Sequence, residues 1–297
     1  MKRCGVILEP QADLGEKALS NAGAYLLGDE ILLLIRVDSD SESHIEWTVF
    51  DPKTKKVSRI HKPLIKPEGE EIGCEDPRIV FLDEPIQKFV ITYTSVAPNG
   101  KTKKIRPYLA LTTDFTKFEK KPIFNFQDKN AVFFPELING EYWLLHRPLS
   151  LWPLSIWLTH SKSLNSFEKG EILFDPIYPW EGHRVGAGPP PIKTEKGWLL
   201  IYHGGKLSKA RFPNKTYSLG VALLKSDDPR QVLSRCREPI LKPEEDYEKN
   251  GLVPNVVFSC GAVLQDDVVD VFYGAADTCI AWASYTLDEL FGYLDLN

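Results

Sequence analysis

The run Val-Phe-Phe-Pro-Glu-Leu-Ile-Asn-Gly-Glu-Tyr-Trp-Leu-Leu-His at residues 132–146 decides the fold class. It contains two short runs rich in apolar and aromatic side chains, Val132–Ile138 and Glu141–His146, separated by a turn that includes Gly140. A third such run, Leu154–His160, follows and leads into a polar turn. Short runs of this kind between turn residues are typical of antiparallel β-strands. The stretch therefore predicts a small unit of consecutive strands.

The same three-strand unit recurs along the chain, so the fold is predicted to be repetitive. The other copies are Ala24–Leu27/Ile31–Val37/His44–Phe50, Arg78–Leu82/Lys88–Thr94/Pro107–Thr113, Pro191–Thr194/Gly197–His203/Tyr217–Leu224 and Val256–Leu264/Val268–Tyr273/Ile280–Tyr285. Five repeats in 297 residues, roughly one per 59, suit the blades of a propeller. The predicted class is an all-β, five-bladed β-propeller.

A pair of β-sandwiches would also produce short strands and turns. The regular repeat count and the lack of a linker rich in Gly, Ser or Pro favour the propeller and a single domain over residues 1–297. The one clear helix candidate is near the end of the sequence. Its apolar residues follow helical spacing, with Thr286 and Glu289 placed as a capping box; they are Leu287, Leu290, Phe291 and Leu294.

Composition and charge exclude several classes of protein. The chain is 43% hydrophobic and 26% charged, the balance of a globular protein, and its 36 basic against 41 acidic side chains give a net charge of −5. We therefore expect no general attraction to nucleic acid or to an anionic membrane. The apolar run at the start stops at Leu8 and meets Glu9 and Pro10, which is not the pattern of a secretion signal.

The cysteines form neither a metal motif nor a disulfide framework. They are odd in number and scattered, at Cys4, Cys74, Cys236, Cys260 and Cys279. A reducing cytoplasm fits this usage best. The six histidines include no ligand-spaced pair on a helix, so a metal site is not indicated.

Several polar residues stand at the ends of predicted strands. Asp76, in the string Glu75-Asp76-Pro77-Arg78, directly precedes the strand Ile79–Leu82, where a propeller would turn it toward the central channel. The alternative is a turn aspartate that pairs with Arg78, and these four residues alone favour that structural role.

Other polar residues have a similar placement. Lys129 and Arg147 flank neighbouring strands, Arg184 lies in a loop rich in Gly and Pro, and His203 and Tyr217 end and begin two further strands. A rigid loop of that kind can approach a ligand closely. Taken singly, each of these residues fits a solvated charge or a turn.

Taken together and in order, these segments resemble glycoside hydrolase family 130, the β-mannoside phosphorylases and related β-mannosidases. The matching strings run from residue 21 to residue 277, and the family's fold is a five-bladed β-propeller. They are Glu75-Asp76-Pro77-Arg78-Ile79, Phe134-Pro135-Glu136, His146-Arg147-Pro148, Gly186-Ala187-Gly188-Pro189-Pro190, Trp198 to Gly204, Tyr217-Ser218-Leu219-Gly220, Val253 to Phe258 and Tyr273-Gly274-Ala275-Ala276-Asp277.

The resemblance implies a role for each matched residue. Asp76 matches the family's proton donor. The positions that match residues holding the mannosyl unit are Asn21, Arg36 and Asp277, and those that match the phosphate grip are Lys129, Arg147, His203 and Tyr217. Arg184 stands where many relatives have lysine, and we expect it to contact substrate. The segment around Asn21 departs most from the family pattern.

The implied reaction is phosphorolysis of a β-mannoside with inversion, which gives α-mannose 1-phosphate. Phosphate is already an anionic nucleophile, so one acid and a cationic cluster suffice. The nearest alternative is a β-mannosidase, which needs a base such as Glu136 or Glu181 to activate water. A non-catalytic glycan-binding propeller would tolerate loss of Asp76, whose presence argues against that class.

We expect the partners to be small molecules only, a β-mannoside and phosphate, with no further cofactor, no nucleic acid and no membrane. Association into a homo-oligomer stays open, because propellers of this kind often associate. Three tryptophans, Trp152, Trp157 and Trp180, are candidates to stack on a sugar, although packing in the core is the commoner use of tryptophan.

Overall fold

The computed structural model describes residues 1–207 and 215–296, and it confirms the all-β class. The first half of the strands are β1 (Lys2–Leu8), β2 (Ala18–Leu27), β3 (Glu30–Asp38), β4 (Ser43–Asp51), β5 (Lys56–Ile65), β6 (Gly73–Leu82), β7 (Lys88–Asn99), β8 (Thr102–Thr112), β9 (Glu119–Pro122) and β10 (Asp128–Phe133). The others are β11 (Tyr142–Pro148), β12 (Ile156–Ser161), β13 (Glu171–Phe174), β14 (Arg184–Ala187), β15 (Ile192–Thr194), β16 (Gly197–Leu207), β17 (Lys215–Leu224), β18 (Val232–Arg235), β19 (Val257–Gln265), β20 (Val268–Ala275) and β21 (Cys279–Thr286).

Helices are few and short. They are the 3-10 helix η1 (Ala12–Leu14) and the α-helices α1 (Asp246–Lys249) and α2 (Leu287–Phe291). Helix α2 is the one that the sequence predicts, and its capping box is present, because Thr286 accepts from the amide of Glu289 and Glu289 accepts from that of Thr286. Helix α1 was not predicted. No helix of the described residues is long and apolar enough to cross a bilayer.

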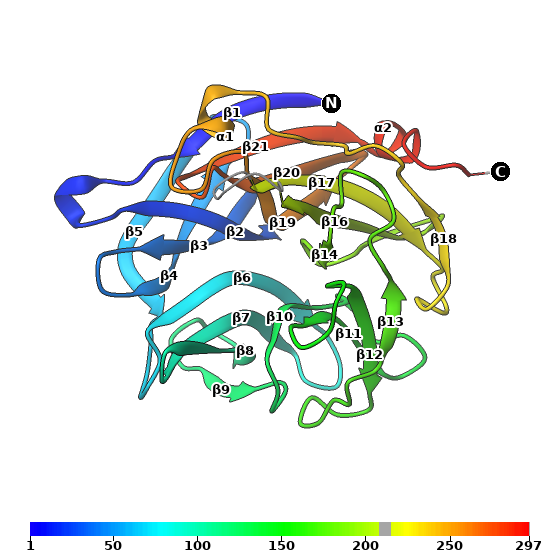
Figure 1. Ribbon diagram of the computed structural model, residues 1–297, viewed down its shortest axis with the longest axis horizontal. Helices are drawn as coiled ribbons and strands as arrows, with labels where there is room; N and C mark the ends of the chain where they lie inside the picture. Colours follow the sequence, from blue (N-terminus) through cyan, green and yellow to red (C-terminus); the bar gives the residue numbers. More distant parts are fainter. Residues whose placement is uncertain (208–214, 297) are drawn as a thin grey trace.

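Each predicted repeat forms a group of antiparallel strands, paired in chain order. The sheets are β10-β11-β12-β13, β14-β16-β17-β18 with β15 on β16, β1-β21-β20-β19, and a larger sheet that runs β2-β3-β4-β6-β7-β8-β9 with β5 on β4. Within that larger sheet, the first two repeats are joined by one parallel pair, between Ser43 and Gly73. Figure 1 shows these groups following one another around the middle of the molecule in chain order.

The sheet of the last repeat takes its outer strand from the other end of the sequence. Strand β1 pairs antiparallel with β21, from Lys2 opposite Ser284 to Leu8 opposite Ile280. Arg3 adds ion pairs to Glu244 at 2.9 Å and to Glu248 at 3.1 Å. This contact brings the first and last strands of the described chain together (Figure 1).

The hydrophobic core lies mainly between neighbouring strand groups. One cluster joins Leu19, Ile31 and Phe50 to Phe272 and Ile280, so the first and last repeats pack together. Another joins residues of β6 to β8 with those of β10 and β11, including Val80, Leu109, Phe133 and Leu144. Because the sheets bury both faces against their neighbours, the polar ends of their first strands are held in fixed positions.

Candidate active site

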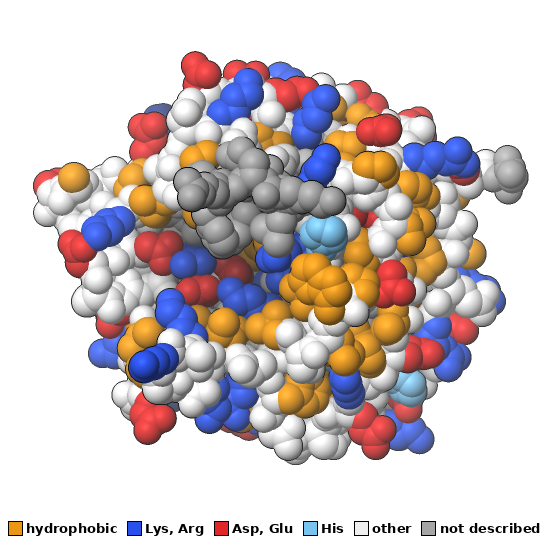
Figure 2. Space-filling view, in the orientation of Figure 1, with side chains coloured by type: hydrophobic (Ala, Val, Ile, Leu, Met, Phe, Trp, Pro, Cys, Tyr) orange, Lys and Arg blue, Asp and Glu red, His pale blue; other side chains and the backbone are white. Residues whose placement is uncertain are grey.

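The predicted site residues gather around one cavity of about 160 Å³, here called the central cavity. It is lined by Asn21, Arg36, Asp76, Lys129, Asn130, Arg147, Tyr217, Val253, Val256, Phe258 and Asp277. Seven of these residues are predicted site residues, and they come from different strand groups. Figure 2 shows a hollow on this face in which acidic and basic side chains lie together, beside hydrophobic ones.

Three of the side chains reach this cavity from equivalent irregularities in strands β2, β6 and β10. Asn21, Asp76 and Asn130 have positive φ angles of 52°, 55° and 58°. At each of them the pairing with the next strand shifts register. Asn and Asp adopt this left-handed conformation more readily than other non-glycine residues, and such a bulge redirects a side chain. The first strand of each of these three groups therefore turns a polar residue toward the centre.

Asp76 is 4% exposed and is held by two donors. Its Oδ1 accepts hydrogen bonds from Nδ2 of Asn21 at 2.8 Å and from Nη1 of Arg36 at 3.3 Å. Burial favours the neutral carboxyl, but the charges of Lys129 and Arg36 outweigh it and lower the pKa of Asp76 to about 2. Asp76 is therefore ionised at neutral pH while the cavity holds no anion.

Glu75, which the sequence did not predict as a site residue, links the two cations beside Asp76. Its Oε1 lies 3.3 Å from Nη2 of Arg36, and its Oε2 lies 3.3 Å from Nζ of Lys129. The opposite charges fix both cations at the edge of the cavity. Its place directly before Asp76, in a string already marked as functional, is the signal that could have identified it.

Asp277 is the second carboxylate that lines the cavity. It has a positive φ of 49°, directly after Ala276 with a φ of 48°. Burial raises the pKa of Asp277 to about 6, and the positive charge of Arg36 opposes this only in part. Two carboxyl groups with very different proton affinities therefore face the same cavity.

His203 does not line the cavity but lies directly behind it, with no exposed surface. Burial and the charge of Arg147 lower the pKa of His203 well below its usual value, so the ring is neutral. Its Nε2 accepts from Nη1 of Arg147 at 3.1 Å and from Nδ2 of Asn130 at 3.2 Å. Phe258 packs on the ring with centroids 4.3 Å apart. His203 thus orients Arg147.

Gly186 provides the space for this arrangement. A Cβ at Gly186 would lie 2.5 Å from Nε2 of His203 and would also meet the side chain of Asn130. Strand β14, which carries Gly186, pairs with β16 so that Gly186 stands opposite His203. Only glycine lets the two strands and the side chain of Asn130 come this close.

Arg184 and Tyr217 form a pair at the edge of the cavity. Nη1 of Arg184 donates to the hydroxyl of Tyr217 at 3.1 Å. Tyr217 lines the cavity, whereas Arg184 does not. A planar guanidinium at this position holds the phenol by one hydrogen bond and keeps other donors free for a ligand.

Arg78 has a structural role that differs from the turn pairing considered as the alternative for Asp76. It is 2% exposed, and its guanidinium donates to the backbone oxygens of Gly188 at 2.7 Å, Asp76 at 2.9 Å and Ala187 at 3.2 Å. It therefore ties the Asp76 bulge to the Gly- and Pro-rich loop of another group. The carboxylate of Asp76 stays available to the cavity.

Buried polar atoms without a hydrogen-bonding partner in the protein concentrate at this site. Of the ten such side-chain atoms among the described residues, five belong to Asn21, Asn130, Arg147, Arg184 and His203. An unpaired buried polar group is costly, so such groups mark places where a polar ligand binds. The central cavity is therefore suited to a ligand with many hydrogen-bonding groups.

The two glutamates that could act as the base of a hydrolase, Glu136 and Glu181, lie outside the central cavity. Glu136 is at the surface and pairs with Lys193. Glu181 is fully buried, pairs with Arg235 at 2.5 Å and accepts from the hydroxyl of Tyr202 at 2.7 Å, so its oxygens are used within the fold. Neither residue lines the central cavity.

The three tryptophans differ in exposure. Trp157 lies under the ammonium of Lys169, and Trp180 donates to the backbone oxygen of Arg237. Trp152 is 65% exposed and packs beside His183, the neighbour of Arg184 in sequence. Trp152 is thus the exposed one of the three.

One other cluster has the composition of a metal site. Oxygens of Glu16 and Glu46 and a nitrogen of His61 lie within 4.8 Å of one another. Arg59 pairs with both carboxylates, at 2.5 Å and 2.8 Å. A guanidinium therefore already supplies the positive charge between them.

Comparison with known proteins gives consistent matches. A family model described as beta-1,4-mannooligosaccharide phosphorylase matches residues 36–296. A 1,2-beta-oligomannan phosphorylase from Thermoanaerobacter sp. (strain X514) is 40% identical over 236 residues, which are 78% of this chain and 75% of that protein. A beta-1,2-mannobiose phosphorylase from Listeria innocua serovar 6a is 37% identical over 243 residues, which are 80% of this chain and 64% of that protein.

A solved structure agrees over almost the whole chain. The complex of beta-1,2-mannobiose phosphorylase from Listeria innocua with beta-1,2-mannobiose superposes with a TM-score of 0.83, at 29% identity, over 95% of this chain and 93% of that one. The family model includes the segments that line the central cavity from Arg36 onward. The chain therefore belongs to glycoside hydrolase family 130.

Proposed function

We propose that the chain cleaves β-mannosides with inorganic phosphate, inverts the anomeric centre and releases α-mannose 1-phosphate in a reversible reaction. The observation that carries this proposal is that two cations, Lys129 and Arg147, line the same cavity as the carboxyl of Asp76. Cationic donors bind a phosphate nucleophile by charge-assisted hydrogen bonds, and a carboxyl group can serve the leaving oxygen. Activating a water molecule needs no such cations.

The residues divide into two sets by their contacts. Lys129, Arg147 and Tyr217 would hold phosphate, with His203 as the neutral acceptor that aims Arg147. The mannosyl unit would be held by Asn21, Arg36 and Asp277, and Arg184 would act through its contact with Tyr217. Glu75 connects the two sets, because it contacts both Lys129 and Arg36.

The proton that Asp76 donates requires an explanation, because its pKa is about 2 in the free site. The charges of Lys129 and Arg36 cause this low value. A phosphate anion bound at Lys129 partly cancels its charge, which raises the pKa of Asp76 at the moment a proton is needed. We propose that this proton reaches the leaving oxygen through a sugar hydroxyl, and that phosphate binding is thereby part of acid catalysis.

The linkage proposed is β-1,2. Both relatives described above are named for 1,2-linked mannosides, whereas the family model is described by a 1,4-linked oligosaccharide. The exposed Trp152 offers an aromatic surface for a further sugar unit outside the cavity.

We also propose that the strand groups are the blades of a five-bladed β-propeller and that residues 1–297 form one catalytic domain. The antiparallel groups that follow one another in chain order support this architecture. Phosphate would be a co-substrate, with no metal or organic cofactor required. The five unpaired cysteines support a reducing location, which we propose to be the cytoplasm.

The test is incubation of the purified chain with β-1,2- and β-1,4-mannobiose, each with and without phosphate, and identification of the products. We expect mannose 1-phosphate from the 1,2-linked sugar only when phosphate is present, and chain extension from α-mannose 1-phosphate in the reverse direction. Free mannose released equally fast without phosphate would instead establish a hydrolase, with Asp277 as the carboxylate in the cavity to examine as its base.

A further inference from the structure

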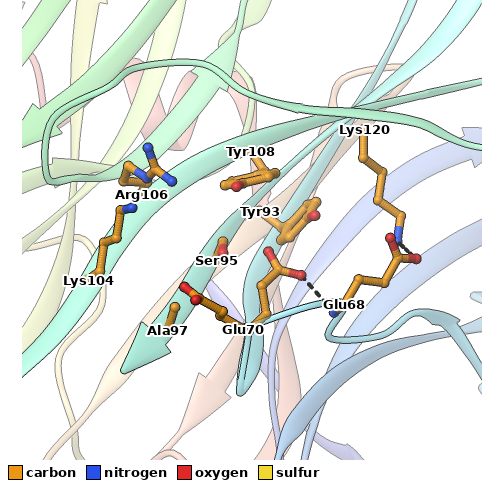
Figure 3. A pocket seen from close by; sticks show the side chains of 10 residues that line it. Glu68, Glu70, Tyr93, Ser95, Ala97, Lys104, Arg106, Tyr108 and Lys120 are labelled. Carbon is orange, nitrogen blue, oxygen red and sulfur yellow. Dashed lines mark hydrogen bonds and ion pairs between the residues drawn. The ribbon is translucent and has the colours of Figure 1, made fainter. Parts of the chain in front are cut away.

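A second cavity lies on strands β7 and β8, outside the central cavity. It has a volume of about 300 Å³ and is here called the hairpin cavity. Three alternate cross-strand pairs form its floor, namely Tyr93 with Tyr108, Ser95 with Arg106 and Ala97 with Lys104. Side chains of alternate residues point to the same face of a sheet, so all six face the cavity. Figure 3 shows the two tyrosine rings side by side, next to Ser95.

The hairpin cavity is separate from the central cavity, although its strand β7 pairs with strand β6, which carries Asp76. Glu75 of β6 is paired with Thr94 of β7, while Cys74 is paired with Ser95. Adjacent residues of a strand point to opposite faces. The side chains of Tyr93 and Ser95 therefore point away from the face that carries Glu75. No residue lines both cavities.

Two buried polar groups of the hairpin cavity have no partner in the protein. Tyr93 is 2% exposed, and its hydroxyl makes no hydrogen bond to any described residue. Oε1 of Glu71, which also lines the cavity, is likewise buried and unpaired. The hydroxyl of Tyr93 can donate a hydrogen bond, whereas the carboxylate oxygen of Glu71 can only accept one. Two other cavities, one lined by Lys193 and Phe291 and one by Trp180 and Lys242, have no such atom among their lining residues.

The charges around the hairpin cavity balance. Its acidic residues are Glu68, Glu70 and Glu71, and its basic residues are Lys104, Arg106 and Lys120. Lys120 pairs with Glu68 at 2.5 Å, and Figure 3 shows this pair across the cavity from Lys104 and Arg106. Equal numbers of both signs give no net attraction to an anion or to a cation. A neutral ligand with several hydroxyl groups matches both kinds of side chain.

We propose that the hairpin cavity is a second saccharide site, which binds one neutral sugar ring. The ring of Tyr108 would pack against the apolar face of the sugar, the hydroxyl of Tyr93 would donate to a sugar oxygen, and Glu71 would accept from a sugar hydroxyl. The volume is at the lower end of the range for ligand pockets, which suits a single ring. The site goes beyond the proposed function, since it holds sugar away from the residues of catalysis.

The test measures sugar binding without turnover. β-1,2-Mannobiose is titrated in phosphate-free buffer into an Arg36→Ala variant, whose central cavity is disabled. Saturation-transfer NMR monitors the binding. Tyr93→Phe keeps the ring and removes one neutral hydrogen bond, so we expect the affinity to fall about two- to tenfold. Tyr108→Ala should abolish binding. Tyr293→Ala, an exposed tyrosine outside both cavities, is the matched control and should change nothing.

Sulfate and spermidine are titrated in parallel as a simple anion and a simple cation, and cellobiose as a neutral sugar of another type. Absence of sugar binding in the Arg36→Ala background, or sugar binding that survives Tyr108→Ala, would overturn the proposal, as would preferred binding of either ion. Melting curves establish that each variant folds. In the otherwise unchanged protein, Tyr93→Phe should leave phosphorolysis of mannobiose unaffected, and this result separates the second site from the proposed activity.

Discussion

Asp76 and Asp277 share a cavity, yet their pKa values are about 2 and about 6. The difference follows from their neighbours. Asp76 is in direct contact with Arg36 and Asn21, while burial dominates at Asp277. Only Asp76 receives hydrogen bonds from both of those donors, which hold its carboxylate in one orientation. This makes Asp76 the better positioned of the two to deliver a proton to one defined oxygen.

Replacing Asp76 by asparagine should therefore reduce kcat on mannobiose by about two to four orders of magnitude, because the amide has no transferable proton. The loss should shrink with an activated aryl β-mannoside, whose leaving group departs without protonation. Steady-state kinetics on both substrates measures this. Glu136→Gln is the matched control, and its kcat should be normal; near-normal turnover of mannobiose by Asp76→Asn would leave Asp76 as a turn residue.

Arg147→Ala should raise the KM for phosphate about ten- to a hundredfold, because loss of a charged hydrogen-bonding partner costs about 1.5–3 kcal/mol. Lys129→Ala should act in the same direction, and the KM for the mannoside should change much less in both. Initial rates at varied phosphate and varied mannoside separate the two constants. Lys193→Ala, at the surface, is the control. If mannoside affinity collapses while phosphate affinity holds, both residues belong to the sugar subsites.

In the free protein, burial raises the pKa of Asp277 to about 6, and the positive charge of Lys129 opposes this effect of burial. An anion bound near Lys129 would partly cancel that charge and should therefore raise the pKa of Asp277 further. Sulfate, doubly charged across this range, should then bind with uptake of protons, and its affinity should fall as the pH rises from 6 through the raised pKa. Calorimetry in buffers of different ionisation enthalpy counts these protons. The Asp277→Asn variant should still bind sulfate but take up far fewer protons. If proton uptake is undiminished in this variant, the protons bind to a group other than Asp277.

The sequence predicted seven of the residues that line the central cavity, because their positions match those of a family. Four of them stand in the matching strings, namely Asp76, Arg147, Tyr217 and Asp277. It did not predict that His203 lies behind Arg147, since burial depends on the packing of β14 against β16. It also did not predict the bridging role of Glu75. Arg36 and Lys129 come from different strand groups, so no spacing in the sequence indicates that Glu75 lies between them.

Among the elements, the strands that the sequence predicted are those with buried, continuous apolar runs. Those it missed include outer strands such as β9, β13 and β18, which have only four residues each and are half exposed. It also missed the buried strand β14, because Arg184 was predicted to lie in a loop rich in Gly and Pro. Strand β9 reads Glu-Lys-Lys-Pro and has no apolar residue besides its proline. Its partner β8 supplies the hydrogen-bonding edge, so tertiary context forms the strand without help from local propensity.

Strand β14 is the element whose backbone position matters most to the site. Gly186→Ala should shift His203 and Asn130, at a cost of about 1–3 kcal/mol for overpacking, and should raise the KM for phosphate through the misplaced Arg147. Thermal melts and phosphate titrations measure the two effects. Gly292→Ala, after helix α2 with its nearest neighbour at 3.3 Å, is the control. Unchanged phosphate affinity in Gly186→Ala would mean that His203 does not orient Arg147.

For the whole molecule, the pairing of β1 with β21 is the contact that joins the two ends of the strand order. Removal of residues 1–8 should lower the Tm by roughly 10 °C or more, because it strips one edge of the last sheet and the ion pairs of Arg3. Scanning calorimetry measures the change. A synthetic peptide of residues 1–8 should restore part of the lost stability, and an unchanged Tm would mean that β1 adds nothing to the stability of the last sheet.

The same pairing sets an order of events during synthesis on the ribosome. Strand β1 is made before the other strands of the described chain and its partner β21 after them, so at about 5–20 residues per second β1 waits on the order of tens of seconds without its partner. Throughout that interval its unpaired backbone edge can accept a strand from another nascent chain. Slower translation lengthens this exposure, so the yield of correctly folded chains should depend on the speed of the ribosome as well as on the stability of the final fold.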